Sequence, residues 1–228
     1  MKYLLLILPL LVLAAIPGFA ASSYLGGFSG LIVTPNDVVV PTGSFDLAFH
    51  DFTGVIGGKD IQTYSLTYGL LPTLEVGASI VHGDGSTDVA LNGKLSLITE
   101  TPTRPAVLVG AFDATGMVNT VNDDPSFYVV VSKNLTATAS EVAGRPSVPF
   151  RLNAGFGSGL YDGFFAGFDW VLHPRFSLMA EYVNGGFGND DNEFNVGARW
   201  AATNDLRLDA GLIDFDNFAF GLSYRFTR

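Results

Sequence analysis

The chain has 228 residues, no cysteine and a formal net charge of −10, from 22 acidic and 12 basic residues. The absence of cysteine excludes disulfides, thiol chemistry and cysteine metal sites. The acidic excess argues against nucleic acid, or an anionic membrane surface, as a binding partner. Apolar residues make up 48% of the chain, with 27 Gly, 19 Phe and 8 Tyr. This composition argues against disorder and is typical of a glycine-rich, aromatic-rich β protein.

Residues 1–20 have the pattern of a secretory signal peptide. Lys2 supplies the positive charge, residues 3–16 are the apolar stretch, and Gly18 and Ala20 are the small residues before a cleavage site. The alternative is a membrane anchor that stays on the protein, but the stretch is shorter than the roughly 20 residues that a spanning helix needs. No later stretch is long and apolar enough for such a helix. We therefore expect export through the inner membrane.

Twelve short segments of the remaining chain alternate apolar and polar residues. In the last of them, even positions from Phe218 to Phe226 are large and apolar, whereas odd positions carry Ala, Gly, Ser and Arg. Such a strand has one apolar face and one polar face. Recurring behind an export signal, the pattern predicts an all-β fold, a transmembrane antiparallel β-barrel of about 12 strands (about 10 to 14) with lipid outside. The predicted strands cover residues 43–52, 60–69, 74–82, 88–98, 106–113, 126–133, 150–157, 163–172, 176–183, 193–201, 206–213 and 217–226.

Connection length suggests how the barrel, residues 43–228, is oriented. Residues 70–73, 172–175 and 202–205 are tight turns after even-numbered strands, whereas most connections after odd-numbered strands are looser. Outer-membrane barrels have short periplasmic turns, so an even strand count puts both termini in the periplasm. Residues 134–149 and 214–216 do not fit this scheme. Residues 21–42 are apolar but interrupted by proline, and they form either a short plug or an extra strand edge in the lumen.

The polar faces of the strands carry charges that we expect to line the lumen. These charges form either the constriction of a solute pathway or a salt-bridged structural interior, and both alternatives stay open. Glycines on the same faces leave space, which slightly favours a water-filled lumen. The lumen charges are Glu75, Lys94, Arg151, Asp169, Glu181, Arg199, Arg207, Asp209 and Arg225, and the glycines are Gly77, Gly155, Gly167, Gly197, Gly211 and Gly221.

Aromatic residues on the apolar faces gather at the strand ends, as expected for girdles at the two headgroup levels. The periplasmic girdle is predicted to hold Phe150, Trp170, Phe176, Trp200 and Phe226, and the outer girdle Phe112, Phe156, Phe164, Tyr182 and Phe194.

Acidic residues concentrate at the predicted outer rim. This asymmetry favours cations, or divalent ions shared with lipid phosphates, although Asp is also a common turn residue. Asp190, Asp191 and Glu193 are weak metal candidates, because their segment lacks the ligand spacing of a calcium loop. No dedicated metal site and no cofactor is predicted. The rim set is Asp51, Asp60, Asp84, Asp88, Asp113, Asp123, Asp124, Asp162, Asp190, Asp191, Glu193, Asp214 and Asp216.

No catalytic site is predicted. The chain has three histidines and neither a GxSxG elbow nor an HExxH motif. An outer-membrane phospholipase needs a lipid-facing Ser beside a His, whereas Ser79, near His82, points inward in the predicted strand. Asp169 and Glu181 are a possible carboxylate pair on neighbouring strands, but pairing with an arginine is favoured.

Two resemblances narrow the interpretation. Gly221, Leu222, Tyr224 and Phe226 resemble the C-terminal signal through which outer-membrane proteins engage the barrel-assembly machinery, although Thr227 and Arg228 follow the terminal aromatic. Residues 30–35, 68–77, 165–169 and 177–182 resemble stretches of YjbH-like outer-membrane proteins, a family linked to exopolysaccharide production.

The sequence therefore predicts a non-enzymatic barrel of the bacterial outer membrane that supports surface polysaccharide export or envelope structure. The alternatives are a small-solute porin with cation preference and, less favoured, a lipid-modifying enzyme. Expected partners are outer-membrane lipid and lipopolysaccharide, the assembly machinery and surface polysaccharide, with no nucleic acid.

Overall fold

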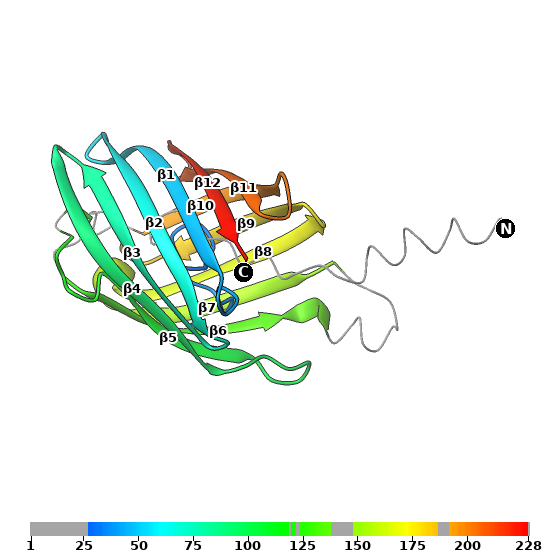
Figure 1. Cartoon of the computed structure of the whole chain (residues 1–228). Helices are drawn as coiled ribbons and strands as arrows, with labels where there is room; N and C mark the ends of the chain where they lie inside the picture. The colour runs from blue at the N-terminus through cyan, green and yellow to red at the C-terminus, as the bar shows by residue number, and fades with distance from the viewer. Residues whose placement is uncertain (1–26, 119, 122–123, 138–147, 187–191, 228) are drawn as a thin grey trace.

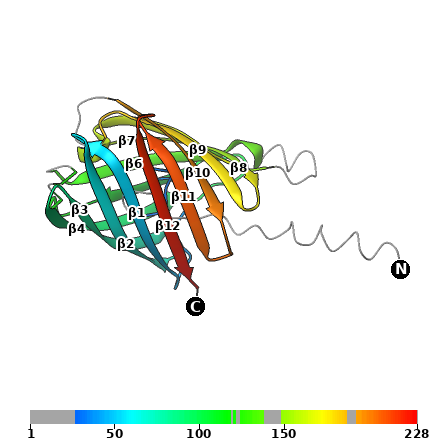
Figure 2. The same ribbon diagram turned by 90° about the horizontal axis from the view of Figure 1, so that it is seen from above.

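A computed structural model describes residues 27–118, 120–121, 124–137, 148–186 and 192–227. Within these residues, twelve antiparallel strands form a closed barrel in which each strand pairs with its neighbours in the chain. β1 (Phe45–Ile56) closes the barrel against β12 (Asn217–Phe226) (Figures 1 and 2). This confirms the predicted fold class and strand count. The other strands are β2 (Lys59–Leu71), β3 (Leu74–Gly83), β4 (Ser86–Ile98), β5 (Ala106–Phe112), β6 (Ser126–Asn134), β7 (Phe150–Gly157), β8 (Gly163–His173), β9 (Phe176–Val183), β10 (Glu193–Ala201) and β11 (Leu206–Ile213).

Phe45 pairs with Phe226, so the first strand begins and the last strand ends at the same end of the barrel. We call this the termini end and the opposite one the far end. A short 3-10 helix, η1 (Gly159–Tyr161), lies at the far end between β7 and β8. None of the helical residues in the described ranges belongs to a helix long and apolar enough to cross a membrane.

Two hairpins at the far end are longer and tighter than predicted. β1 and β2 are joined by Gly57 and Gly58, with φ of 56° and 80°, and β3 and β4 by Asp84 and Gly85, with φ of 50° and 77°. Two successive residues with positive φ form the type I′ turn, whose twist matches that of the flanking strands. The strands therefore extend into residues 53–56 and 86–87, beyond the predicted bounds at 52 and 88.

Loop length does not distinguish the two ends of this barrel. The far end has these two-residue turns as well as the longer connection at residues 113–125, and the termini end has residues 99–105 and 135–149 beside short turns. The predicted rule of short turns at one end and long loops at the other is therefore wrong here. Placing the termini end in the periplasm stays a prediction.

The outer surface of the barrel is apolar along the strands. Leu47, Leu66, Leu91 and Leu222 are among the exposed large residues, which is the expected surface of a barrel that faces acyl chains. Trp170 and Trp200 lie exposed near the termini end, and Phe156 and Phe194 near the far end. Phe112 is an exception to the predicted girdles.

Phe112 points into the barrel, with 1% of its surface exposed, and its ring lies 6.5 Å from that of Phe28. Its assignment to the outer girdle is wrong because β5 is apolar on both faces, so that alternation alone does not identify the inner one.

The barrel interior has an apolar half and a polar half. Toward the far end, buried side chains from ten of the strands, from η1 and from the turn residues Val118 and Val121 form one apolar cluster. The turn after β5 brings Val118 into it: Asp113 accepts hydrogen bonds from Val118 N and Thr115 Oγ1, both at 2.8 Å. The cluster includes Phe52, Ile61, Val81, Leu108, Phe112, Val118, Val121, Tyr128, Leu160, Tyr161, Phe165, Val183, Ile213 and Ala219.

Residues 27–40, which we call the luminal segment, occupy the interior between the two halves. Gly30 and Pro35 form an antiparallel bridge, and Leu31 N donates to Thr34 O at 2.9 Å, so the segment folds back on itself. Its Phe28, Leu31, Ile32 and Val33 are fully buried members of the apolar cluster. The blue chain inside the barrel in Figure 1 follows this course.

The luminal segment joins β1 through a tight contact at the termini end. Gly43 N donates to Gly69 O at 2.8 Å, and Gly69 N donates to Ser44 O at 3.1 Å. A Cβ atom on Gly69 would come within 2.2 Å of Pro41 O. A glycine is therefore required where β2 carries this connection.

The outward face gives a direct test of membrane exposure. Ala210→Arg places a charge on an exposed position in the middle of β11. We expect the free energy of unfolding in lipid bilayers to fall by about 2–4 kcal/mol, the cost of Arg at the midplane. Urea titration followed by heat-modifiable gel mobility measures it. Asn204→Arg, in an exposed turn, is the control, and equal losses for both variants would contradict the facing assignment.

Candidate functional site

The first contact between wall and luminal segment is a buried pair, Glu75 and Lys94, opposite each other on β3 and β4. Lys94 Nζ lies 3.4 Å from Glu75 Oε1. Glu75 accepts hydrogen bonds from Ser29 N at 2.8 Å, Ser29 Oγ at 2.7 Å and Val40 N at 2.7 Å. Lys94 donates to the carbonyl oxygens of Ser29 at 2.6 Å, Asn36 at 3.1 Å and Val38. This pair thus holds both limbs of the segment at one level.

The second contact is Glu181 on β9, which binds residues 32–34, where the luminal segment turns back on itself. Its carboxylate accepts from three consecutive amides: Ile32 N at 3.2 Å, Val33 N at 2.7 Å and Thr34 N at 3.1 Å. Thr34 Oγ1 donates to it at 2.7 Å, and Asn195 Nδ2 at 3.1 Å. A carboxylate buried without a charged partner is costly unless several donors surround it. Here the donors come mainly from the luminal segment.

Tyr161, in η1, contacts the segment from the far end. Its hydroxyl donates to Val33 O at 3.2 Å. Burial raises the pKa of this phenol well above its usual value, so the hydroxyl remains protonated and available as a donor.

The third contact, Arg199 on β10, binds the segment and the wall at once. Its Nε donates to Asp209 Oδ1 at 2.7 Å, and its Nη1 and Nη2 donate to Gly30 O at 3.2 Å and Leu31 O at 3.3 Å. Asp209 Oδ2 also lies 3.6 Å from Nε2 of the fully buried His50.

Gly221 makes room for His50. The two residues are paired on β12 and β1, and a Cβ on Gly221 would come within 1.9 Å of His50 Cδ2. Any larger residue would displace the imidazole, so the lumen itself requires this glycine. Leu222, Tyr224 and Phe226, the other residues that resemble a C-terminal signal, lie exposed on the outer face.

Two further arginines lie near the termini end. Arg225 forms a bidentate pair with Asp46, with Nε at 2.6 Å and Nη2 at 2.5 Å from its oxygens. Arg207 is buried opposite Ser223, and its Nε and Nη1 have no hydrogen-bond partner among the described residues. Three arginines and two aspartates therefore meet on the wall of β10–β12 and β1.

Arg151 on β7 links the luminal segment to the rim. It forms an ion pair with Asp37 of the segment and lies 3.3 Å from Glu100, which Lys133 also contacts at 3.2 Å. Asp169 lies opposite Arg151, whereas Glu181 lies opposite Gly167. Register thus favours the arginine over a carboxylate pair as the neighbour of Asp169.

The interior glycines do not leave the open water that the sequence analysis favoured. A Cβ on Gly167 would come within 2.6 Å of Leu31 Cδ1, and one on Gly155 within 2.4 Å of the Phe165 ring. Together with Gly221, these positions receive neighbouring side chains. A cavity of about 230 Å³ remains at the termini end, between the luminal segment and the wall, with Arg151, Asp169, Ser177 and Arg199 among its lining residues.

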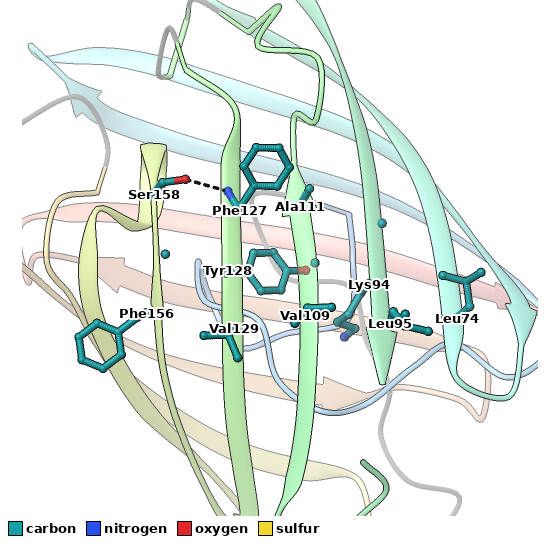
Figure 3. Close-up of a pocket in the computed structure, with 13 residues that line it drawn as sticks. Leu74, Lys94, Leu95, Val109, Ala111, Phe127, Tyr128, Val129, Phe156 and Ser158 are labelled. Atoms are coloured by element: carbon teal, nitrogen blue, oxygen red, sulfur yellow. Dashed lines mark hydrogen bonds between the residues drawn. The ribbon is translucent and has the colours of Figure 1, made fainter. Parts of the chain in front are cut away.

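A larger hollow of about 670 Å³ lies along β3–β7 (Figure 3). Most of its lining side chains are apolar and outward-facing, such as Leu95, Val109, Val129 and Phe156. Lys94 and Tyr128, whose side chains are buried, also contribute to its lining. Ser158 Oγ accepts from Phe127 N at 3.2 Å at one edge, the dashed line in Figure 3. Such a surface suits acyl chains rather than a polar solute.

The acidic rim is smaller than predicted. Asp113 and Glu193 are buried, and Asp84 is paired with Lys59. Asp60, Asp124, Asp162, Asp214 and Asp216 are exposed. Asp123, Asp190 and Asp191 lie outside the described residues. In the described ranges, no three His, Cys, Asp or Glu side chains are grouped to hold a metal ion.

The histidines and serines considered for catalysis lie apart. His50 is enclosed in the lumen, whereas His82 is exposed and contacts Thr87 Oγ1 at 2.8 Å. Ser79 points inward, where its hydroxyl accepts from Asn92 Nδ2 at 2.8 Å. None of these arrangements places a nucleophile beside a base on the lipid face.

Comparison with known proteins gives relatives in structure. No family model and no curated protein matches the sequence. The KdgM porin matches with a TM-score of 0.54 at 8% identity, covering 81% of this chain and 99% of that one. A KdgM porin in complex with disordered oligogalacturonate matches with 0.50 at 9% identity, over 81% and 99%. The outer membrane protein Omp33 of Acinetobacter baumannii matches with 0.50 at 12% identity, over 81% and 98%. At these identities the matches show the fold, which is that of porin-like outer-membrane barrels.

The anchoring role of Glu181 gives a prediction. Glu181→Gln removes the negative charge that three amides share, and hydrogen bonds to a charged group are worth about 1.5–3 kcal/mol against about 1 for neutral ones. We expect hydrogen exchange at Ile32, Val33 and Thr34 to rise about tenfold or more. Mass-resolved exchange on the purified protein measures this rise. The control is Asp60→Asn, at the exposed hairpin where Asp60 accepts from Gly54 N at 2.9 Å, and unchanged exchange in Glu181→Gln would refute the anchor.

Proposed function

We propose that this protein is a small-solute channel of the bacterial outer membrane whose own luminal segment closes it. The observation that carries the proposal is what occupies the barrel lumen. Small barrels of about 8 strands are filled by wall side chains, whereas larger ones enclose a channel. Here, the lumen of twelve strands is occupied by residues 27–40, a stretch of chain attached to the barrel wall at one end, at Gly43 and Ser44.

The charged residues of the wall support this proposal. Glu75, Lys94, Glu181 and Arg199 make polar contacts with the luminal segment. If the segment moves, these groups face a water-filled space in which charges are stable without it. The same set then becomes the charged lining of a solute pathway.

The structural relatives support the channel and the outer-membrane location. KdgM and Omp33 share the fold at TM-scores of 0.50 or more, and KdgM is named a porin. The polysaccharide role and the YjbH-like resemblance rest on short stretches of sequence, and no family model adds to them. We therefore place the porin function ahead of polysaccharide export and ahead of a lipid-modifying enzyme.

The exposed rim supports a cation preference for the open channel. Asp60, Asp162, Asp214 and Asp216 are exposed at the far end, and a mouth lined by one sign of charge raises the local concentration of counter-ions.

Conductance tests the proposal. Ile32 is fully buried in the apolar cluster, and Ile32→Asp adds a charge close to Glu181, so the segment should leave the lumen. We expect the wild-type protein to be nearly silent in planar bilayers and Ile32→Asp to give steady openings that favour K⁺ over Cl⁻ in reversal-potential measurements.

The matched control is Thr42→Asp, which adds the same charge to an exposed position beyond the segment and should stay silent. Heat-modifiable gel mobility confirms that each variant has assembled. An assembled Ile32→Asp barrel that remains silent would rule out the channel.

A further inference from the structure

We infer that the lumen is a binding site for short apolar peptides, and that the luminal segment occupies it as an internal ligand. This inference rests on the proposed function, since it names the class of solute that the channel would accept.

The wall recognises peptide groups rather than particular side chains. Of the fourteen hydrogen bonds described above between wall and luminal segment, three use a side chain of the segment, those of Ser29, Thr34 and Asp37. The other eleven end on its backbone. Any chain that adopts the same course offers the same N–H and C=O groups.

The wall groups match both halves of a peptide unit. Glu75 and Glu181 accept from amides, whereas Lys94 and Arg199 donate to carbonyls. Charged groups form the stronger hydrogen bonds. They lie on β3, β4, β9 and β10, so the ligand is held from two sides of the barrel.

The apolar half of the lumen adds side-chain selection. Leu31 packs against Gly167, where the absence of a Cβ makes room for its side chain. Ile32 and Val33 are fully buried in the cluster. A carbohydrate has no aliphatic side chains to fill this half. Charged groups that form hydrogen bonds with peptide N–H and C=O groups, together with an aliphatic pocket, indicate a peptide with aliphatic residues as the ligand.

The experiment uses the full-length Ile32→Asp protein and a capped fluorescent peptide of residues 28–36. We expect saturable binding by fluorescence anisotropy and block of the open channel by the same peptide. The wild-type protein, whose lumen is occupied, is the matched control for peptide taken up by detergent. If Ile32→Asp does not assemble, Val33→Asp is measured instead, since Val33 is likewise fully buried and its amide donates to Glu181, so that the added charge should also displace the segment.

Backbone recognition is tested by methylating single amide nitrogens of the peptide. Methylation at Val33 removes the 2.7 Å bond to Glu181 and should weaken binding about 10- to 100-fold, as expected for one hydrogen bond to a charged acceptor. Methylation at Phe28, whose N–H makes none of the contacts described above, should leave affinity unchanged.

The outcomes separate this inference from the channel proposal. Openings in Ile32→Asp without peptide binding above the wild-type level would refute the peptide site and leave the channel. Binding without openings would keep the site and refute the channel. Equal affinity for the peptide methylated at Val33 would also refute the site. A neutral trisaccharide that blocks as strongly as the peptide would refute the assignment to peptides.

Discussion

The interior of this barrel depends on a single requirement: buried polar groups need partners. An irregular stretch of chain in a closed lumen carries amides and carbonyls that no sheet satisfies, and the wall carries buried carboxylates and cations. Either set would be unstable if it stayed buried without the other, because burying an unpaired charge or amide costs several kcal/mol. Glu75, Glu181, Lys94 and Arg199 satisfy both sets at once.

This mutual dependence explains why wall and segment form one unit. Removing one partner of such a contact leaves the other buried and unpaired, which costs more than the contact itself contributes. The apolar half of the interior adds ordinary burial of Phe28, Leu31, Ile32 and Val33. The closed state is therefore held by polar contacts at several levels of the lumen, from Glu75 to Tyr161, and by packing toward the far end.

The fold could be predicted because alternation with period two is visible in one strand at a time. Nine of the twelve strands begin and end within one residue of their predicted bounds, and five of these, β7, β9, β10, β11 and β12, match them at both ends. Prediction failed where alternation does not distinguish the inner face from the outer one. Because β5 is apolar on both faces, the prediction that Phe112 faces outward is wrong. The Asp84–Gly85 turn was missed as well, although an Asp-Gly pair between alternating stretches is a hairpin signal.

The candidate site could be predicted only in part. The inward parity of Glu75, Lys94, Glu181 and Arg199 follows from alternation, but their partners are backbone groups 35 to 169 residues distant, which no local pattern encodes. The glycines misled the analysis for a related reason. From the sequence alone, a glycine on the inner face predicts empty space. In the fold, the side chains of Leu31 and His50 fill the space at Gly167 and Gly221.

The contact at Gly69 has a consequence for direction. In the proposed channel, the Gly43 and Ser44 contacts to Gly69 would make the segment pivot about the termini end, while the apolar cluster lies toward the opposite end. On this proposal, the segment opens the lumen toward one compartment only. Whatever triggers release must then act from the side of the membrane that the pivot faces, and solutes in the other compartment meet a surface that does not respond to them.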